Sequence, residues 1–319
     1  MSWKKKAIEM MVSTDKSWRQ IAKELGKSKS TVSDYLRKFK NNPEHLQEVV
    51  LPENKPKILL FDIETSTILA HVFGLFKQNI SLSAIQDDWY TICFSAKWYK
   101  QGGVFNYSVH NYDLPPSGQY KDNERYVVEA LWKYLDECDI AVAYNGSKFD
   151  KKKINWKFFE YGLSEPSPYK IIDPYLIVKG NFSPTSGKMD YIAKYCDDID
   201  NSKHSTDMSL WVACRNNDVQ SLDYMSSYCD QDIVLLEKVY DAVKHWDKNS
   251  PQMMMYYDDD EMRCNSCGGV HLTKLDNKAA YTSLSKFEIY RCDDCSKIMR
   301  GRDNQISKEK RKNFVMNVR

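Results

Sequence analysis

The 319-residue sequence has no apolar run that approaches the length of a membrane-spanning helix. Its N-terminus, MSWKKKAIEMMV, is basic and lacks both a long apolar stretch and a small-residue cleavage site, so we expect no secretory signal peptide. The six histidines show no metal-ligand spacing. These absences argue against a membrane protein, an exported protein and a histidine-based metal site, and they predict a cytoplasmic protein without a membrane partner.

Disulfide bonds are not expected either, although the chain has nine cysteines. Without an export signal, cysteines are more typical of reduced thiols or metal ligands. Two C-x-x-C pairs, separated by 24 residues, are formed by Cys264, Cys267, Cys292 and Cys295. Four thiolates bind Zn²⁺ tetrahedrally. A module of fewer than about 40 residues usually needs a metal ion or disulfides for stability. We therefore predict a zinc ribbon over residues 263–300 with one structural Zn²⁺. We expect buried thiols at Cys93, Cys138, Cys196, Cys214 and Cys229.

The net charge is small, at +2, because two basic ends offset an acidic middle. Residues 1–40 carry a net charge of +7 and residues 297–319 one of +6, which leaves −11 for the stretch between them. This distribution suits a metal-dependent enzyme that acts on a polyanion, with carboxylates for cations and basic arms for phosphates. The alternative is that the ends are solvated charge runs. The basic tail, residues 301–319, could hold nucleic acid nonspecifically.

The N-terminal stretch SWRQIAKELGKSKSTVSDYLRKF predicts two short helices around a tight turn. Ile21, Ala22 and Leu25 form one apolar stripe, Gly26 supplies the turn, and Ser28 can cap the second helix. The second helix has its own apolar stripe, formed by Val32, Tyr35, Leu36 and Phe39. An amphipathic stretch from Lys4 to Val12 would complete a three-helix unit.

This N-terminal unit resembles the helix-turn-helix domains of resolvases and transcription regulators. Its predicted nucleic-acid-binding residues are Lys29, Ser30, Thr31, Ser33 and Arg37. Asp34 on the same face counts against tight DNA binding, and a three-helix protein-interaction module is the alternative. We predict a helix-turn-helix domain over residues 1–40 and, from three prolines, a linker over 41–56.

The central region opens with KILLFDIETS, where Ile58 to Phe61 and Ile63 suit a strand covered on both faces. Strand-like runs follow at 91–99, 104–110 and 140–144, with a helical run at 124–137. Strands that alternate with helices predict an α/β domain, which we place over residues 57–248. A linker containing three consecutive methionines, over 249–262, would lead to the ribbon.

Small groups of residues stand out at three places in this domain. They are Asp62 and Glu64 in the first strand, Asn145, Phe149 and Asp150 after the strand at 140–144, and Tyr228 and Asp232 in a helix over 224–243. Residues two apart on a strand, or four apart on a helix, share a face. The middle group follows a strand at a strand-to-helix junction, where open α/β sheets place ligands. Asp62 and Glu64 ending a buried strand suggest a metal site.

The motifs FDIET, NGSKFD and YCDQD resemble the three exonuclease motifs of the DEDD superfamily in its tyrosine-bearing branch, which includes the proofreading domains of family-B DNA polymerases. The stretches DWYTICFSAKWY, SPYKIIDP, KMDYIAKY and DIVLLEKVY further resemble stand-alone phage and prophage 3′–5′ exonucleases. The resemblance covers residues 55–300. It implies a ribonuclease H-like fold, hydrolysis of single-stranded DNA or 3′ ends, a role in replication, proofreading or repair, and a host cytoplasm if a phage encodes the chain.

The resemblance also implies roles for the site residues. Asp62 would bridge two Mg²⁺ or Mn²⁺ ions, Glu64 and Asp232 would hold the ion that activates water, and Asp150 would support the second ion. Tyr228 would orient the attacking water. Asn145 and Phe149 would shape the pocket or contact the substrate. Without metal, four converging carboxylates should have raised pKa values.

Several alternatives remain open at this stage. Asp173 could support the site or simply end a strand, and Lys151, Lys152 and Lys153 could meet the substrate or be solvated. A ribonuclease that trims RNA 3′ ends and a DNA-binding regulator that keeps the fold as a scaffold are the rival functions. A separate DNA polymerase is a candidate partner, while the strand preference, the target of the N-terminal helices and the oligomeric state are not predicted.

Overall fold

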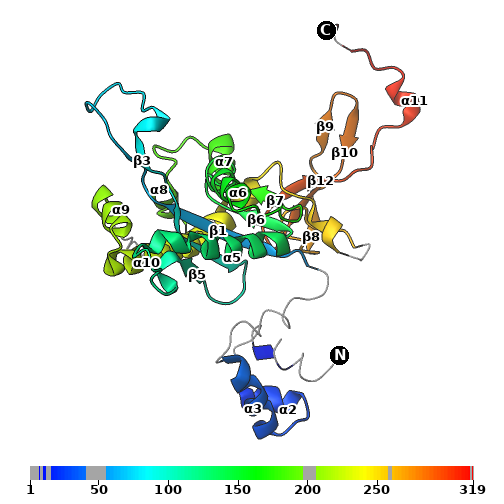
Figure 1. Ribbon diagram of the computed structural model, residues 1–319. Helices are drawn as coiled ribbons and strands as arrows, with labels where there is room; N and C mark the ends of the chain where they lie inside the picture. The colour runs from blue at the N-terminus through cyan, green and yellow to red at the C-terminus, as the bar shows by residue number, and fades with distance from the viewer. Residues whose placement is uncertain are drawn as a thin grey trace. The chain divides into compact units, whose positions relative to one another are not determined.

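In the computed structural model of the protein, the described residues are 7, 10–11, 16–40, 55–196, 206–257, 261–316 and 318. The chain divides into two compact units. The first contains the N-terminal helices, and the second contains both the central domain and the cysteine-rich C-terminal module (Figure 1). The predicted linker at 41–56 lies outside the described residues except for its last two positions.

The first unit has two helices, α2 (Trp18–Glu24) and α3 (Lys29–Lys40). Ser17 and Gln20 form a capping box at the start of α2, and Gly26 turns the chain with a φ of +60°. Ile21, Ala22, Val32 and Leu36 are buried together, as the apolar pattern predicts. Of the third predicted helix only residues 7, 10 and 11 are described, and they are helical.

The second unit is built around a five-stranded mixed sheet. Its strands are β1 (Ile58–Thr65), β4 (Thr91–Trp98), β5 (Phe105–Ser108), β6 (Ile140–Val142) and β7 (Lys170–Ile172). Their spatial order is β5-β4-β1-β6-β7; β4 runs antiparallel to β1 and β5, whereas β6 runs parallel to β1 and β7. The predicted strands are present, and the α/β class is confirmed.

The α-helices of this unit are α5 (Glu124–Glu137), α6 (Asp150–Glu160), α7 (Pro174–Asn181), α8 (Met189–Ala193), α9 (Met208–Arg215), α10 (Val219–Val243) and, near the C-terminus, α11 (Lys308–Arg311). The helix predicted over 124–137 is confirmed. The helix predicted to begin at residue 224 begins five residues earlier, because the Asp218 carboxylate caps it by accepting the Ser221 N–H at 3.0 Å. A small hairpin of β2 (Leu69–Ala70) and β3 (Ile85–Asp87) was not predicted.

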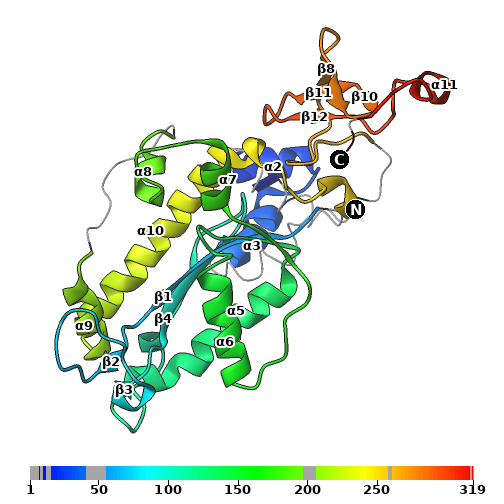
Figure 2. The ribbon, with the colours of Figure 1, turned by 90° about the horizontal axis from the view of Figure 1, so that it is seen from above.

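The two faces of the sheet are covered by different helices, as the side chains of β4 show. Phe94 and Trp98 both contact Tyr134 of α5, with ring centroids 6.2 Å apart in each pair. Ser95 points the other way and donates a hydrogen bond to Asp230 of α10 at 2.6 Å. Because successive strand residues alternate between faces, α5 covers one face and α10 the other (Figure 2).

Two further polar contacts hold α10 along β4. Lys97 pairs with Glu237, and the Tyr99 hydroxyl donates to Asp241. Glu237 and Asp241 follow Asp230 by seven and eleven residues, so all three acids lie on one side of the helix. This row of contacts fixes both the rotation of α10 and its position along the sheet.

The C-terminal module has a three-stranded sheet of β8 (Leu272–Lys274), β11 (Ile289–Cys292) and β12 (Ile298–Arg300), and a hairpin of β9 (Ala280–Thr282) and β10 (Ser285–Phe287). It contacts the short helix η4 (Lys244–Trp246), where the Ser266 hydroxyl donates to the Lys244 carbonyl at 3.3 Å. Met253, in the predicted linker, is 2% exposed. The described residues 249–257 of this stretch are therefore partly packed rather than a free connector.

Candidate active site

Asp62 and Glu64 lie near the end of β1, on the face that α10 covers. In the antiparallel pairing, Asp62 is opposite Ser95 and Glu64 is opposite Cys93. Residues directly opposite each other project to the same side of the sheet, and Ser95 contacts α10. The spacing of two residues therefore directs both carboxylates toward α10, as the sequence predicts.

Helix α10 completes an acidic group at this point. Ligand oxygens of Asp62, Glu64 and Asp232 all lie within 4.8 Å of one another. Asp62, Tyr228 and Asp232 line an open cleft of about 910 Å³. The structure thus brings together, from β1 and α10, residues that are about 170 positions apart in the sequence.

The group is electrostatically unfavourable without a cation. Burial raises the pKa of the Asp62 carboxyl well above its usual range, and Asp150, Glu64 and Asp232 raise it further by repulsion. This agrees with the expected behaviour of converging acids. Carboxylate oxygens are the donors that Mg²⁺ and Mn²⁺ prefer, so the donor set fits hard divalent cations.

Tyr228 lies one helical turn before Asp232, and its hydroxyl is hydrogen-bonded to that carboxylate. Burial raises the pKa of the Tyr228 phenol, and the nearby negative charge of Asp232 raises it further. The phenol therefore stays protonated at neutral pH. Beside it, the Cys229 thiol lies 3.7 Å from Oδ2 of Asp62.

Asp150 lies beside the acidic group rather than within the part that converges to 4.8 Å. It is the first residue of α6, is 3% exposed, and accepts a hydrogen bond from the backbone N–H of Ile63 at 3.2 Å. Burial raises its pKa to about 7. Its role as a ligand of a second ion stays a prediction.

The turn between β6 and α6 places Asn145 at the cleft. Asn145 has a φ of +58°, and a Cβ on Gly146 would lie only 2.2 Å from the Cβ of Ala143, so glycine is required there. Asp173 holds this turn, because its carboxylate accepts the backbone N–H groups of Asn145 at 2.8 Å and Ser147 at 3.2 Å. Asp173 also caps α7, so it does more than end a strand.

The remaining predicted substrate residues lie around the start of α6. Phe149 is 40% exposed and is not among the described residues that line the cleft. Lys153 extends over the ring of Trp89, with its Nζ 3.7 Å from the ring centroid. Lys151 similarly lies 5.4 Å from the ring centre of Tyr169. These two lysines therefore contact aromatic rings rather than only solvent.

Some cleft residues were not singled out from the sequence. They are Tyr144, Tyr175, Lys188 and Asp190. Tyr144 ends the apolar run IAVAY, and its hydroxyl donates to the Gly187 carbonyl at 2.7 Å, which ties the turn to the segment before α8. Lys188 and Asp190 belong to the stretch KMDYIAKY, which is one of those that resemble stand-alone phage and prophage exonucleases. That resemblance could have indicated these two residues as part of the cleft.

A comparison with protein families matches residues 100–244 to the RNase_H superfamily. The matched part of the central domain is therefore RNase H-like. The matched range contains Asp150, Tyr228 and Asp232 and begins after β1, which carries Asp62 and Glu64. No curated protein matches the chain.

Among solved structures, the chain is similar to the family B DNA polymerase from the hyperthermophilic archaeon Pyrobaculum calidifontis. The sequence identity is 14% and the TM-score is 0.38. The alignment covers 76% of this chain and 34% of the polymerase chain, so this chain spans only about a third of the polymerase's length.

The C-terminal module contains a second group of residues that could bind a metal ion. The Sγ atoms of Cys264, Cys267, Cys292 and Cys295 all lie within 4.8 Å of one another. The contacts between Cys264 and Cys295 and between Cys267 and Cys292 are both 3.6 Å. Tetrahedral Zn–S bonds of about 2.3 Å would place sulfurs about 3.8 Å apart, so the four thiols fit a zinc ion.

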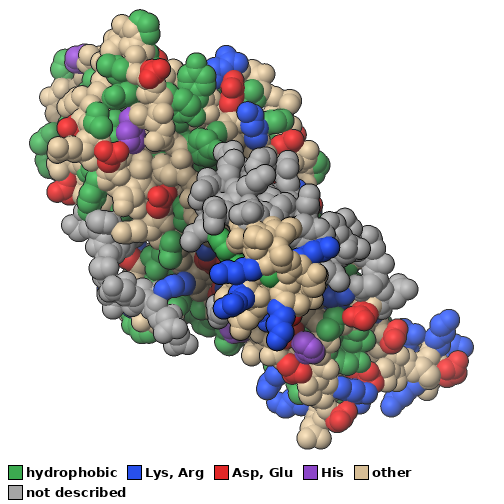
Figure 3. Space-filling view, turned by 90° about the horizontal axis from the view of Figure 1, so that it is seen from below, with side chains coloured by type: hydrophobic (Ala, Val, Ile, Leu, Met, Phe, Trp, Pro, Cys, Tyr) green, Lys and Arg blue, Asp and Glu red, His purple; other side chains and the backbone are tan. Residues whose placement is uncertain are grey.

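The N-terminal residues predicted to bind nucleic acid belong to the other unit. Lys29, Ser30 and Thr31 are exposed and Ser33 is half-buried, whereas the side chain of Arg37 lies outside the described residues. Lys and Arg side chains surround the exposed surface of these helices (Figure 3). DNA binding by this unit stays a prediction. None of the helices in the described ranges is both long and apolar enough to cross a membrane.

Proposed function

We propose that the protein is a two-metal-ion 3′–5′ exonuclease that hydrolyses phosphodiester bonds of DNA. The observation that carries the proposal is the convergence of Asp62, Glu64 and Asp232 within 4.8 Å beside an open cleft. The RNase H-like match over residues 100–244 supports nuclease chemistry. The direction of degradation and the choice of DNA follow from the resemblance of the three motifs to DEDD exonucleases.

Two Mg²⁺ or Mn²⁺ ions are the proposed catalytic cofactors. Asp62 would contact both ions, Glu64 and Asp232 would hold one, and Asp150 would support the other. Bound divalent ions supply stabilisation of the negative charge on the attacking and leaving oxygens of a phosphodiester. The raised pKa of Asp62 supports the proposal, because bound cations would offset the repulsion that raises it.

The protein's own groups would position the reactants. The protonated Tyr228 hydroxyl, held by Asp232, would orient the attacking water at the cleft. Asn145, fixed by Asp173, would contact the terminal nucleotide, and the exposed ring of Phe149 would stack on a base. The turn between β6 and α6, which Asp173 holds by hydrogen bonds, would then determine how the substrate lies in the cleft.

The other two modules would position the enzyme on its substrate. The N-terminal helices would bind DNA through Lys29, Ser30, Thr31, Ser33 and Arg37, and the zinc-bound ribbon would complete the second unit. By resemblance, the protein would act beside a separate polymerase in a phage-infected cell.

The proposal is tested by measuring the release of mononucleotides from single-stranded DNA with Mg²⁺, Mn²⁺ or EDTA. Asp62→Asn and Asp232→Asn should lower the rate by at least about 10³-fold and leave the far-ultraviolet circular dichroism spectrum unchanged. The matched control is Asp190→Asn, an acid that also lines the cleft but lies outside the converging group.

A parallel reaction with RNA of the same sequence identifies the substrate. Faster release from DNA supports the proposal, whereas cleavage that requires the 2′-hydroxyl would make the protein a ribonuclease. Full activity of both purified Asn variants would show that Asp62 and Asp232 are not required for cleavage, and the proposed mechanism would then be wrong.

A further inference from the structure

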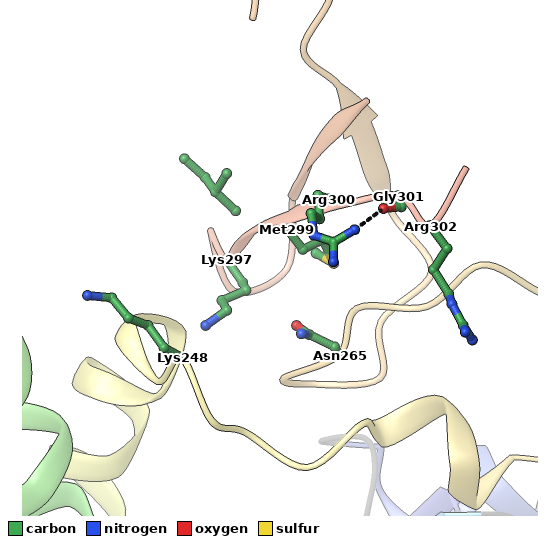
Figure 4. A pocket seen from close by; sticks show the side chains of 8 residues that line it. Lys248, Asn265, Lys297, Met299, Arg300, Gly301 and Arg302 are labelled. Atoms are coloured by element: carbon green, nitrogen blue, oxygen red, sulfur yellow. Dashed lines mark hydrogen bonds between the residues drawn. The ribbon is translucent and has the colours of Figure 1, made fainter. Parts of the chain in front are cut away.

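A second hollow, distinct from the catalytic cleft, lies where the ribbon contacts the end of the RNase H-like domain. Its volume is about 350 Å³. Lys248 borders it from the stretch that follows η4, and Asn265, Lys297, Arg300 and Arg302 border it from the ribbon (Figure 4). No acidic residue is among the described residues that line it. The hollow therefore concentrates positive charge.

Within the described ranges, none of the four cations forms an ion pair. The Asp247 carboxylate acts on Lys297 only from beyond ion-pair distance. The Lys297 ammonium is held at the wall by a hydrogen bond to the carbonyl of Asp247, and the side chain is only 7% exposed. A buried cation held by a neutral carbonyl keeps donors available for an anion.

Arg300 is also held in place before any ligand binds. Its guanidinium lies over the ring of Phe287, 4.1 Å from the centroid, and donates one hydrogen bond to the Gly301 carbonyl at 3.2 Å. An arginine has five N–H donors in a fixed fork that matches phosphate oxygens. Most of its donors therefore remain free in a preorganised position.

Asn265 also lines this hollow, and its buried Oδ1 has no hydrogen-bond partner among the described residues. An amide oxygen accepts hydrogen bonds, as phosphate oxygens do, so only the Nδ2 group of Asn265 can donate to an anion. The affinity of the hollow for an anion therefore depends on its cations.

A third hollow of about 300 Å³ adjoins the cationic hollow, because Lys248 lines both. Ser147 and Leu176 line the third hollow, while Asn145 and Tyr175, close to them in the chain, line the cleft. A strand whose 3′ end lies in the cleft would therefore pass over this part of the surface to reach the cations.

We propose that the cationic hollow binds backbone phosphates of the substrate strand, several nucleotides upstream of the 3′ end in the cleft. The inference rests on the proposed nuclease function, because that function places the 3′ end. It adds a site that would favour long strands over short ones. The ribbon would then be part of the substrate-binding surface as well as a structural module.

The test uses full-length, zinc-loaded protein in which three exposed cations are changed together, Lys248→Gln, Arg300→Gln and Arg302→Gln. Binding of 5′-fluorescent oligothymidylates of 30 and 6 nucleotides is measured by anisotropy without divalent metal. We expect the 30-mer to bind at least about tenfold more weakly and the slope of log K against log salt to fall by about 2. Binding of the 6-mer should be unchanged.

Two matched variants separate a site from a general charge effect. Lys133→Gln, Lys170→Gln and Lys278→Gln together remove the same charge from exposed positions away from the hollow and should leave binding unchanged. Lys248→Arg, Arg300→Lys and Arg302→Lys together keep the charge and should retain most of the affinity. Equal 30-mer binding and salt dependence in wild type and the first triple variant would overturn the inference.

The outcome is independent of catalysis, since no step of the binding measurement requires cleavage. If the wild type fails to cleave but the first triple variant loses 30-mer binding, the site stands and the nuclease proposal fails. If the wild type cleaves and the triple variant binds and cleaves long strands normally, the nuclease stands and the site fails.

Discussion

The Asp173 carboxylate accepts a hydrogen bond from the backbone N–H of Asn145 at 2.8 Å. The same carboxylate accepts from the N–H groups of Ser147 and Tyr175 at 3.2 and 3.1 Å. One side chain at the end of β7 therefore fixes the turn that leads to Asp150 and also caps α7. Asp173 acts as a positioning residue for the cleft.

We predict that Asp173→Ala destabilises the protein by about 1–3 kcal/mol, because it leaves buried N–H donors without their acceptor. Cleavage should slow mainly through a higher KM, since Asn145 loses its position. Urea unfolding and steady-state kinetics measure the two effects. Asp173→Asn, which keeps an acceptor oxygen, should be milder in both; equal losses in the two variants would argue against the hydrogen bonds as the cause.

Tyr228→Phe removes the hydroxyl but keeps the ring and all the carboxylates. We predict that kcat falls about 10²–10³-fold, because the attacking water loses a hydrogen-bond partner. The increase in melting temperature on adding Mg²⁺ should remain, since no acid is lost. A variant with the wild-type kcat would remove Tyr228 from the reaction.

The buried acids predict how the stability of the metal-free protein depends on pH. Burial raises the pKa of Asp150 to about 7, whereas an unfolded aspartate titrates near 3.8. Between these values the folded state binds more protons than the unfolded state, so the free energy of unfolding falls as pH rises. We therefore expect the melting temperature in EDTA to fall between pH 5 and pH 7.5.

Asp150→Asn supplies the control for this prediction, because the amide oxygen can still accept the Ile63 N–H. The melting temperature of this variant should rise relative to that of the wild type as the pH increases from 5 to 7.5. Saturating Mg²⁺ should reduce the pH dependence of the wild type. A difference in melting temperature between wild type and Asp150→Asn that stays constant with pH would contradict the raised pKa of Asp150.

The four-cysteine site predicts one zinc ion per chain by atomic emission. Cys292→Ser should lose the ion and the order of the ribbon, because so small a module depends on its metal. Cys138→Ser, at a buried thiol outside the cluster, should retain it. The release of mononucleotides from short oligonucleotides should fall by less than about threefold in Cys292→Ser. Full zinc content in that variant would exclude Cys292 as a ligand.

Local patterns in the sequence predicted the parts of the site that lie on regular elements. The spacing of Asp62 and Glu64 on a strand, and of Tyr228 and Asp232 on a helix, determines which way each pair points. Apolar runs and a helical run also located β1, β4 and α5. These features depend on residues within a few positions of one another.

Other features depend on contacts between distant segments and could not be read locally. The role of Asp173 requires β7 to lie beside β6, and the Ser95–Asp230 hydrogen bond requires α10 to cross β4. The cationic hollow requires the ribbon to contact the stretch around Lys248. Its charges are spread over three predicted segments, the central domain, the ribbon and the basic tail, so no segment alone indicated a site.

The most direct measurement is a time course with a 30-nucleotide single strand labelled at its 5′ end, incubated with Mg²⁺ and either wild type or Asp62→Ala. We predict a ladder that shortens one nucleotide at a time from the 3′ end, requires the metal and is absent in the variant. Products of internal cleavage, a ladder that persists in Asp62→Ala, or an intact strand with wild type would contradict the account.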